Sequence, residues 1–311
     1  MTLLELIRSA AKQLTDANVS FGHGTTNALD EAAWLVLWSL GLPLQTAFEP
    51  LADNPDSHAN RPVAPADVAR VATLLEARIA TRQPAAYLTG EAWLQGVAFY
   101  VDKRVIVPRS LIAELLVGGG IDYWLRESTH RVLDLCTGNG SLAVLAAMAF
   151  PEVMVTASDL SDDALEVARI NVDKHQLQER ITLLQSDGLQ ATALQAQGPF
   201  DLIVCNPPYV NAHSMAQLPA EYLAEPALAL CGGADGMDFV RRLLHDAPAH
   251  MAPQAVLVLE IGNERAHFEA AFPQLEVVWL ETSAGEDQVL LVTREALSGL
   301  GLHTHQAKKG G

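Results

Sequence analysis

From Arg131 onward, short apolar runs alternate with helical patterns, and this alternation constrains the fold more than any other feature of the sequence. The apolar runs lie at residues 132–136, 153–158, 181–185, 202–205, 255–261, 277–280 and 288–293. Helical patterns separate most of them, at residues 141–150, 161–175, 238–251 and 264–272. Such alternation predicts an α/β fold, in which helices cover both faces of a parallel sheet. Only residues 281–287 join the last two runs, which favours an antiparallel hairpin there.

The first ninety residues carry a different pattern. Apolar residues recur at helical spacing over residues 3–14, 29–40 and 68–79, with a loop expected at 50–65 and a linker at 83–90. Strand-like runs at 98–101 and 105–107 flank Asp102-Lys103-Arg104, which predicts a hairpin with its turn at these three residues. We therefore expect a helical domain at 1–90, a β-hairpin linker at 91–107, the sheet domain at 108–298 and a flexible tail at 299–311.

The charge is strongly acidic, at −17 overall. Residues 1–90 hold nine acids and six bases, so the remaining 28 acids and 14 bases place −14 on residues 91–311. A protein that binds nucleic acid through phosphates needs the opposite balance, so direct nucleic-acid binding is disfavoured. A basic macromolecular partner would instead be attracted.

Metal, membrane and export signals are not evident in the sequence. The three cysteines, Cys136, Cys205 and Cys231, form no CxxC or His/Cys cluster, so we expect no metal site and small buried strand residues at Cys136 and Cys205. No apolar run reaches the roughly 18 residues that span a bilayer. The N-terminus carries Glu5 and Arg8 and lacks the order of a signal peptide. These features predict a cytoplasmic protein without membrane contact.

A glycine-containing turn follows the first apolar run of the sheet. Val132–Leu135 leads into Cys136-Thr137-Gly138-Asn139-Gly140, where a helix opens. Glycines let a ligand approach the backbone, and a helix N-terminus supplies free N–H groups. The spacing Gly138-x-Gly140-x-x-Ala143 also fits the dinucleotide fingerprint, so a nicotinamide-dependent oxidoreductase stays an alternative.

Acids at three successive strand ends favour S-adenosylmethionine over a dinucleotide. Asp134 suits the cofactor's cationic amino group, whereas a pyrophosphate would gain nothing from a carboxylate there. Asp159 is placed to accept both ribose hydroxyls, and Asp187 to accept from the adenine amino group. Together they fit a crevice at the carboxyl edge of the sheet. We predict S-adenosylmethionine as the cofactor, bound by Asp134, Thr137, Gly138, Gly140, Asp159, Asp187, Gly188 and Asn206.

The motif Asn206-Pro207-Pro208-Tyr209 at the end of an apolar run predicts the chemistry. The Asn206 side-chain oxygen and the Pro207 carbonyl offer two acceptors for the two hydrogens of a planar amino group. Tyr209 offers a face for stacking. An amide nitrogen is a poor nucleophile, and acceptors placed for its tetrahedral geometry would bind the transition state preferentially. We predict Asn206, Pro207 and Tyr209 as catalytic, with Pro208 and Arg109 also contacting substrate.

From about residue 84 to 294 the chain resembles the glutamine N5-methyltransferases of the HemK/Prm family. The resemblance covers residues 134–140, which we call the cofactor loop, the motif Asn206–Tyr209 and five further motifs, at residues 87–90, 107–109, 225–226, 233–236 and 259–262. It implies a Rossmann-like class I methyltransferase fold, with seven mostly parallel strands and an antiparallel last strand, preceded by a small helical domain. It also implies that the helical domain helps to choose a protein substrate. Arg109 and Glu91 lie in linker segments that we expect to face the mouth of the active site, and a purely structural role is the alternative for both.

Two branches of this family differ in substrate. Cys136, residues 110–114 and residues 285–288 are similar to the branch that methylates a glutamine of large-subunit ribosomal protein three, a basic partner. The alternative branch methylates release factors. Because the Asn-Pro-Pro-Tyr motif is shared with adenine-N6 methyltransferases, a nucleic-acid substrate is a second alternative. A non-catalytic assembly factor that binds ribosomal proteins is a third, which the intact amide-binding motif disfavours.

Overall fold

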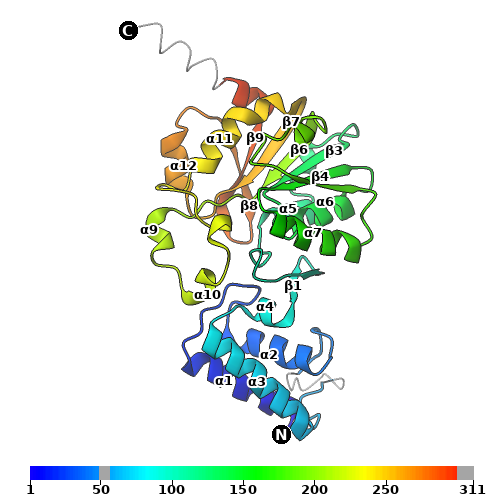
Figure 1. The fold of residues 1–311 in the computed structure, drawn as a ribbon, viewed down its shortest axis with the longest axis vertical. Helices are drawn as coiled ribbons and strands as arrows, with labels where there is room; N and C mark the ends of the chain where they lie inside the picture. The colour runs from blue at the N-terminus through cyan, green and yellow to red at the C-terminus, as the bar shows by residue number, and fades with distance from the viewer. Residues whose placement is uncertain (49–56, 300–311) are drawn as a thin grey trace.

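The structure is a computed structural model that describes residues 1–48 and 57–299. Its N-terminal part consists of helices, which lie below the sheet in Figure 1: α1 (Leu3–Asp16), α2 (Ala28–Ser39), α3 (Pro65–Thr81) and α4 (Ala85–Thr89). The first three confirm the helical patterns of the sequence. A capping box formed by Thr2 and Glu5 begins α1, and Pro65 occupies the first turn of α3. The expected linker at 83–90 is wrong in part, because α4 forms within it.

The hairpin lies within residues 91–107, but not where it was predicted. Its strands are β1 (Glu91–Leu94) and β2 (Val97–Tyr100), joined by Gln95-Gly96. Both turn residues have positive φ, 50° and 76°, which the commonest two-residue hairpin turn requires. Asp102 does bind Arg104 in a turn, yet residues 105–107 form no strand.

A seven-stranded sheet has the order β5-β4-β3-β6-β7-β9-β8. Its strands are β3 (Arg131–Leu135), β4 (Met154–Asp159), β5 (Ile181–Gln185), β6 (Phe200–Cys205), β7 (Met251–Glu260), β8 (Val278–Thr282) and β9 (Gly285–Thr293). Neighbours from β5 to β7 pair in parallel, whereas β9 is antiparallel to both β7 and β8. All seven predicted strands, the antiparallel final hairpin and the fold class are confirmed.

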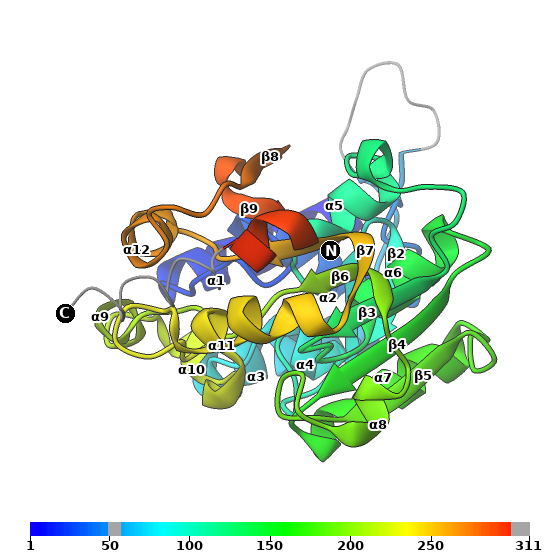
Figure 2. The ribbon, with the colours of Figure 1, turned by 90° about the horizontal axis from the view of Figure 1, so that it is seen from above.

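Helices cover both faces of the sheet because successive strand residues point to opposite sides. Val132 packs with α5 (Ile112–Val117) and α6 (Ser141–Ala149), whereas Leu133 packs with α11 (Asp238–Asp246) and α12 (Arg265–Ala271). Figure 2 shows α5 and α11 on opposite sides of the strands. The remaining helices are α7 (Asp162–Lys174), α8 (Thr192–Gln195), α9 (Ala212–Met215), α10 (Ala220–Leu223), η1 (Asp122–Trp124), η2 (Ala227–Ala229) and η3 (Ala247–Ala249).

The helix predicted at 238–251 ends earlier, at Asp246. Pro248 lies in the 3-10 turn η3, and Met251 already begins β7. Of the predicted tail, residues 300–311 lie outside the described residues, as does much of the predicted loop at 50–65. The division into domains stays a prediction. Among the described residues, no helix is long and apolar enough to cross a membrane.

Candidate active site

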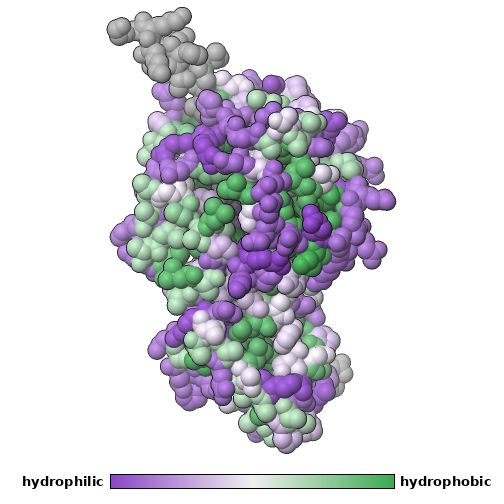
Figure 3. Space-filling model, viewed as in Figure 1, coloured by the Kyte–Doolittle hydropathy of each residue, from purple (hydrophilic) through white to green (hydrophobic). Residues whose placement is uncertain are grey.

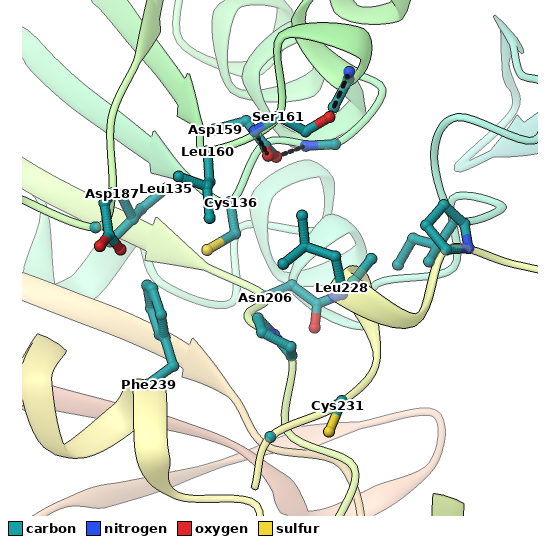
Figure 4. A pocket seen from close by; sticks show the side chains of 18 of the residues that line it. Leu135, Cys136, Asp159, Leu160, Ser161, Asp187, Asn206, Leu228, Cys231 and Phe239 are labelled. Atoms are coloured by element: carbon teal, nitrogen blue, oxygen red, sulfur yellow. Dashed lines mark hydrogen bonds between the residues drawn. The ribbon is translucent and has the colours of Figure 1, made fainter.

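A cavity of about 750 Å³ opens at the carboxyl ends of β3, β4, β5 and β6. Because parallel strands end at the same edge, residues that follow four different strands meet there. Of the predicted cofactor ligands, the cavity is lined by Gly138, Asp159, Asp187, Gly188 and Asn206. Figure 4 shows Asp187 and Asp159 around one part of the cavity and Asn206 at another.

Asp134 and Thr137 are buried and are not among the residues that line the cavity. The Thr137 hydroxyl donates to Asp134 Oδ2 at 2.5 Å, and the Ala143 N–H donates to the same oxygen at 2.9 Å. Asp134 is 0% exposed, and its Oδ1 has no partner among the described residues. Burial raises the pKa of Asp134 to about 7, although both hydrogen bonds oppose the shift. A buried carboxylate oxygen without a donor is stabilised by a nearby cation.

The cofactor loop has the backbone conformation that its glycines suggested. Gly138 and Gly140 have φ of 55° and 80°, and even Cys136 has a φ of 61°. A Cβ at Gly138 would meet no atom within 4 Å, so its α-carbon faces open space. A Cβ at Gly140 would lie 3.2 Å from Ala168 Cβ, so this glycine lets α6 approach α7 and is not among the residues that line the cavity.

Asp159 and Asp187 occupy different environments. Asp159 accepts from the Gly138 N–H at 2.9 Å and from the Ser161 N–H at 3.0 Å, and burial raises its pKa despite these bonds. Its carboxylate oxygens keep lone pairs for further donors. Asp187 is exposed and lies 3.1 Å from Arg242, at the rim.

Apolar residues that line the cavity, among them Leu160 and Phe239, were missed by the sequence analysis. Leu160 follows Asp159 and is 48% exposed, and Phe239 on α11 lies near Gly188, where a Cβ would be 3.7 Å from its ring. Figure 4 shows the Phe239 side chain beside Asp187. Both offer apolar surface to a flat heterocycle. Phe239 belongs to a helical pattern far along the chain, and nothing in the local sequence marks it.

The Asn206–Tyr209 motif divides between the cavity and the core. Asn206 and Pro208 line the cavity, whereas Pro207 and Tyr209 are not among its lining residues. The Tyr209 hydroxyl lies 3.4 Å from Glu260 Oε1, and burial raises the pKa of this phenol. Its ring packs against Gly262, where a Cβ would lie 2.5 Å from it.

Arg109 also lies outside the set of cavity-lining residues. Its guanidinium forms two hydrogen bonds of 2.7 Å with Glu225 and lies 5.4 Å from the centre of the Tyr222 ring. Both partners belong to residues 210–231, which we call the wall segment because its later residues line the cavity beside Asn206. Those residues are Pro226, Leu228, Ala229 and Cys231.

Comparisons with known proteins identify the family. The family model "Methyltransferase small domain" matches residues 122–232. A ribosomal protein uL3 glutamine methyltransferase of Bordetella pertussis is 54% identical over 299 residues, which cover 96% of each chain. That of Burkholderia pseudomallei is 51% identical and covers 94% of each. This chain belongs to the family of ribosomal protein uL3 glutamine methyltransferases. It is therefore an S-adenosylmethionine-dependent methyltransferase, and the resemblance read from its motifs is confirmed.

A solved structure of the hMettl16 catalytic domain in complex with MAT2A 3'UTR hairpin 6 is also similar, at 15% identity and a TM-score of 0.49. The match covers 72% of this chain and 80% of that one. Membership of a methyltransferase family decides against the nicotinamide alternative, even though the glycine spacing fits both cofactors.

The residues at the cavity fit S-adenosylmethionine. The cofactor carries an ammonium group, a ribose diol and an adenine ring. Asp159 offers its carboxylate to the diol, and Leu160 and Phe239 offer apolar surface to the ring. Asp134 is not a lining residue, but its buried Oδ1 lacks a donor and its charge complements the ammonium group. No group of three or more potential metal ligands occurs among the described residues, so the prediction of a metal-free site is not contradicted.

Proposed function

We propose that this chain methylates the side-chain amide nitrogen of a glutamine in ribosomal protein uL3. The observation that carries the proposal is the position of Asn206, at the end of β6 and in the cavity that fits the cofactor. Relatives with 54% and 51% identity over nearly the whole chain are named for this reaction. A ribosomal-protein substrate also implies a cytoplasmic location.

The cofactor would be held by residues of three strand ends. Asp134 would stabilise its amino group, Asp159 would accept from the ribose hydroxyls, and Asp187 and Phe239 would flank the adenine. Gly138 leaves room for the close approach of the ligand. When bound, S-adenosylmethionine supplies an electrophilic methyl group on a sulfonium centre.

Asn206 would orient the amide and stabilise its change of geometry. Its side-chain oxygen and the Pro207 carbonyl would accept the two N–H hydrogens, which leaves the nitrogen lone pair free to face the methyl donor. As the nitrogen becomes tetrahedral, both acceptors bind it more strongly than in the planar ground state. Glu260 would hold Tyr209, and so the end of the motif, through the phenol hydroxyl.

The cavity walls are also mainly apolar where Leu228 faces Asn206 (Figure 4). Closing an apolar site around the reacting groups excludes water and removes the solvation of the sulfonium charge, which is lost in the transfer. Methyl transfer would first give an N-protonated methylamide cation, which is strongly acidic and loses its proton to solvent without a dedicated base.

A competition between substrates tests the proposal. Purified uL3, a release factor and ribosomal RNA are incubated side by side with labelled cofactor, and the modified residue is located by mass spectrometry. We expect label on one uL3 glutamine and none when that glutamine is replaced by Asn. Preferential labelling of the release factor would identify it, and not uL3, as the substrate. Label in RNA would overturn the assignment of an amide as the methylated group.

A further inference from the structure

The wall segment is a closed loop that begins directly after the Asn206–Tyr209 motif. The Val210 N–H donates to the Leu230 carbonyl at 2.8 Å, and the Gly232 N–H donates to the Val210 carbonyl at 2.9 Å. These bonds bring the two ends of the segment together beside the motif. Its middle, with α10, extends towards the N-terminal helices, as Figure 1 shows.

The side chain of Glu221, on α10, contacts residues of the N-terminal helical part. Although only 2% exposed, its Oε1 accepts from Arg78 Nη1 at 3.3 Å, from Arg82 Nη1 at 3.2 Å and from the Ser20 N–H at 3.2 Å. Arg78 is 0% exposed and also donates to Glu31 at 2.8 Å. Helix α3, its C-cap residue Arg82 and the loop at Ser20 therefore share one carboxylate of the wall segment, and Arg78 also links α3 to Glu31 on α2.

Glu225 is held in a second cluster, four residues further along. It accepts from both Arg109 nitrogens at 2.7 Å and from the Val107 N–H at 2.8 Å. The buried His23, from the N-terminal part, lies 3.5 Å from its other side. The His23 ring also packs on Tyr222, with centroids 4.3 Å apart.

We propose that the N-terminal part, together with Arg109, holds the wall segment in its reactive position through Glu221 and Glu225. Arg78, Arg82 and Arg109 are then positioning residues for methylation of the protein substrate. The cavity-lining residues follow Glu225 immediately, so a shift of this carboxylate displaces Pro226 and Leu228 relative to Asn206. The activity measurement below rests on the proposed function, whereas the exchange measurement does not.

Burial makes this attachment rigid. A buried charge that loses its partner keeps the cost of its desolvation, so the wall segment cannot leave the helices without leaving several charges unpaired. The segment also exposes apolar side chains, with Leu223 at 62% and the cavity-lining Leu228 at 58% exposed, and Figure 3 shows apolar residues over this region. The packing on the N-terminal side therefore determines where the segment lies.

The test uses the full chain with Glu221→Gln, which keeps the shape of the side chain and removes its charge. Arg82→Gln is the second variant, because Arg82 is 33% exposed and its loss is easier to tolerate in folding. Arg82→Lys keeps the charge and should restore part of the effect. Val71→Ala is the control for lost stability, since Val71 is buried among the N-terminal helices. Asp67→Asn, in an exposed pair with Arg70 on the same helix, is the control for lost charge.

Amide hydrogen exchange is measured first, without any substrate. We expect Glu221→Gln and Arg82→Gln to speed exchange in residues 211–230 at least tenfold, while exchange in the cofactor loop and in the Asp67→Asn variant stays unchanged. Val71→Ala should speed exchange in the N-terminal helices and leave the wall segment unaffected. Equal protection of residues 211–230 in Glu221→Gln and the wild type would overturn the proposal, whatever the substrate of the enzyme.

Kinetics with uL3 then separate positioning from general destabilisation. A small displacement of a positioned group costs up to about a hundredfold in rate, so we expect kcat/KM to fall about ten- to a hundredfold in Glu221→Gln. The dissociation constant for S-adenosylmethionine should change less than threefold, because Asp159 and Asp187 lie elsewhere in the cavity. A loss no larger than that of Val71→Ala would also overturn the proposal.

Discussion

The titration of Asp134 gives a sharp prediction for cofactor binding. Its pKa of about 7 means that about one tenth of the protein holds the carboxylate ionised at pH 6 and about nine tenths at pH 8. If the cofactor's ammonium group is stabilised by the ionised form, the affinity should rise about tenfold between these pH values. That ratio corresponds to about 1.4 kcal/mol.

The linkage between ionisation and folding determines how Asp134 changes the stability of the protein with pH. A carboxyl with a folded-state pKa above its usual 3.8 stabilises the protein only while it is protonated, and this contribution is lost as the pH rises towards 7. Without cofactor, Asp134 therefore lowers stability at neutral pH. A bound cation reverses the preference, so binding near pH 6 should release close to one proton.

Isothermal titration calorimetry in buffers of different ionisation enthalpy measures both the affinity and the proton release. Asp134→Asn should bind more weakly, release no proton and lose the pH dependence. Asp187→Asn, at the exposed rim, should keep both the proton release and the pH dependence of binding. Asp159→Asn should shift the dependence to lower pH, because the Asp159 charge contributes to the raised pKa of Asp134. An affinity of the wild type that is constant from pH 6 to 8, without proton release, would refute the role given to Asp134.

Four further predictions concern other parts of the molecule. Asn206→Ala should lower kcat about 10²–10³-fold, with the cofactor dissociation constant within threefold of wild type by calorimetry. Asp159→Ala should raise that constant about ten- to a hundredfold, because a hydrogen bond to a charged group contributes about 1.5–3 kcal/mol. The Glu225 pKa of about 2 lies below its usual 4.5, so the roughly 3 kcal/mol that it contributes is present above pH 4.5 and lost as the pH falls towards 2. Denaturant titrations across this range should show a flatter profile for Glu225→Gln. Finally, kcat/KM for basic uL3 should fall as salt rises, because exposed charges are screened beyond about 8 Å at physiological salt, whereas kcat should respond less.

Each of these measurements has a contradicting outcome. Normal turnover in Asn206→Ala would remove this side chain from the mechanism, and unchanged affinity in Asp159→Ala would place the ribose elsewhere. A Glu225→Gln variant that loses stability between pH 4.5 and 2 as steeply as the wild type would mean that other carboxyls govern acid unfolding. A salt-independent kcat/KM would show that charge does not steer the encounter with substrate.

The cofactor-binding side of the molecule could be predicted because short, continuous sequence patterns specify its strands and the residues that follow them. Apolar runs specify the strands, and the residues that end them, such as Asp159 and Asn206, meet at one edge whatever the rest of the chain does. Asp134 lies one residue before the end of β3, but its burial and its bond with Thr137 could not be predicted, because they depend on how the turn closes. The position of the hairpin was predicted wrongly because Gln95-Gly96 is a weaker turn signal than Asn-Gly or Asp-Gly.

The substrate side could not be predicted because its contacts join distant positions. Ser20 and Glu221 are 201 residues apart, and Val107 and Glu225 are 118 apart. Neither the helical pattern of α3 nor the motif at residues 225–226 indicates that Arg78 and Glu221 share a buried site. The position of Phe239 could not be predicted for the same reason, because only the folded sheet brings its helix to Gly188.

Discrimination between a glutamine and an adenine must come from outside the Asn206–Tyr209 motif, since both substrates offer a planar amino group to the same acceptors. An extruded base also needs contacts to its flanking phosphates, which basic side chains supply. Three arginines line the cavity, and each is already paired with a carboxylate: Arg104 with Asp102, Arg241 with Asp235 and Arg242 with Asp187. A phosphate would have to displace these partners, whereas a polypeptide meets the apolar wall beside Asn206. The pairing of the arginines therefore favours a protein substrate independently of the overall charge.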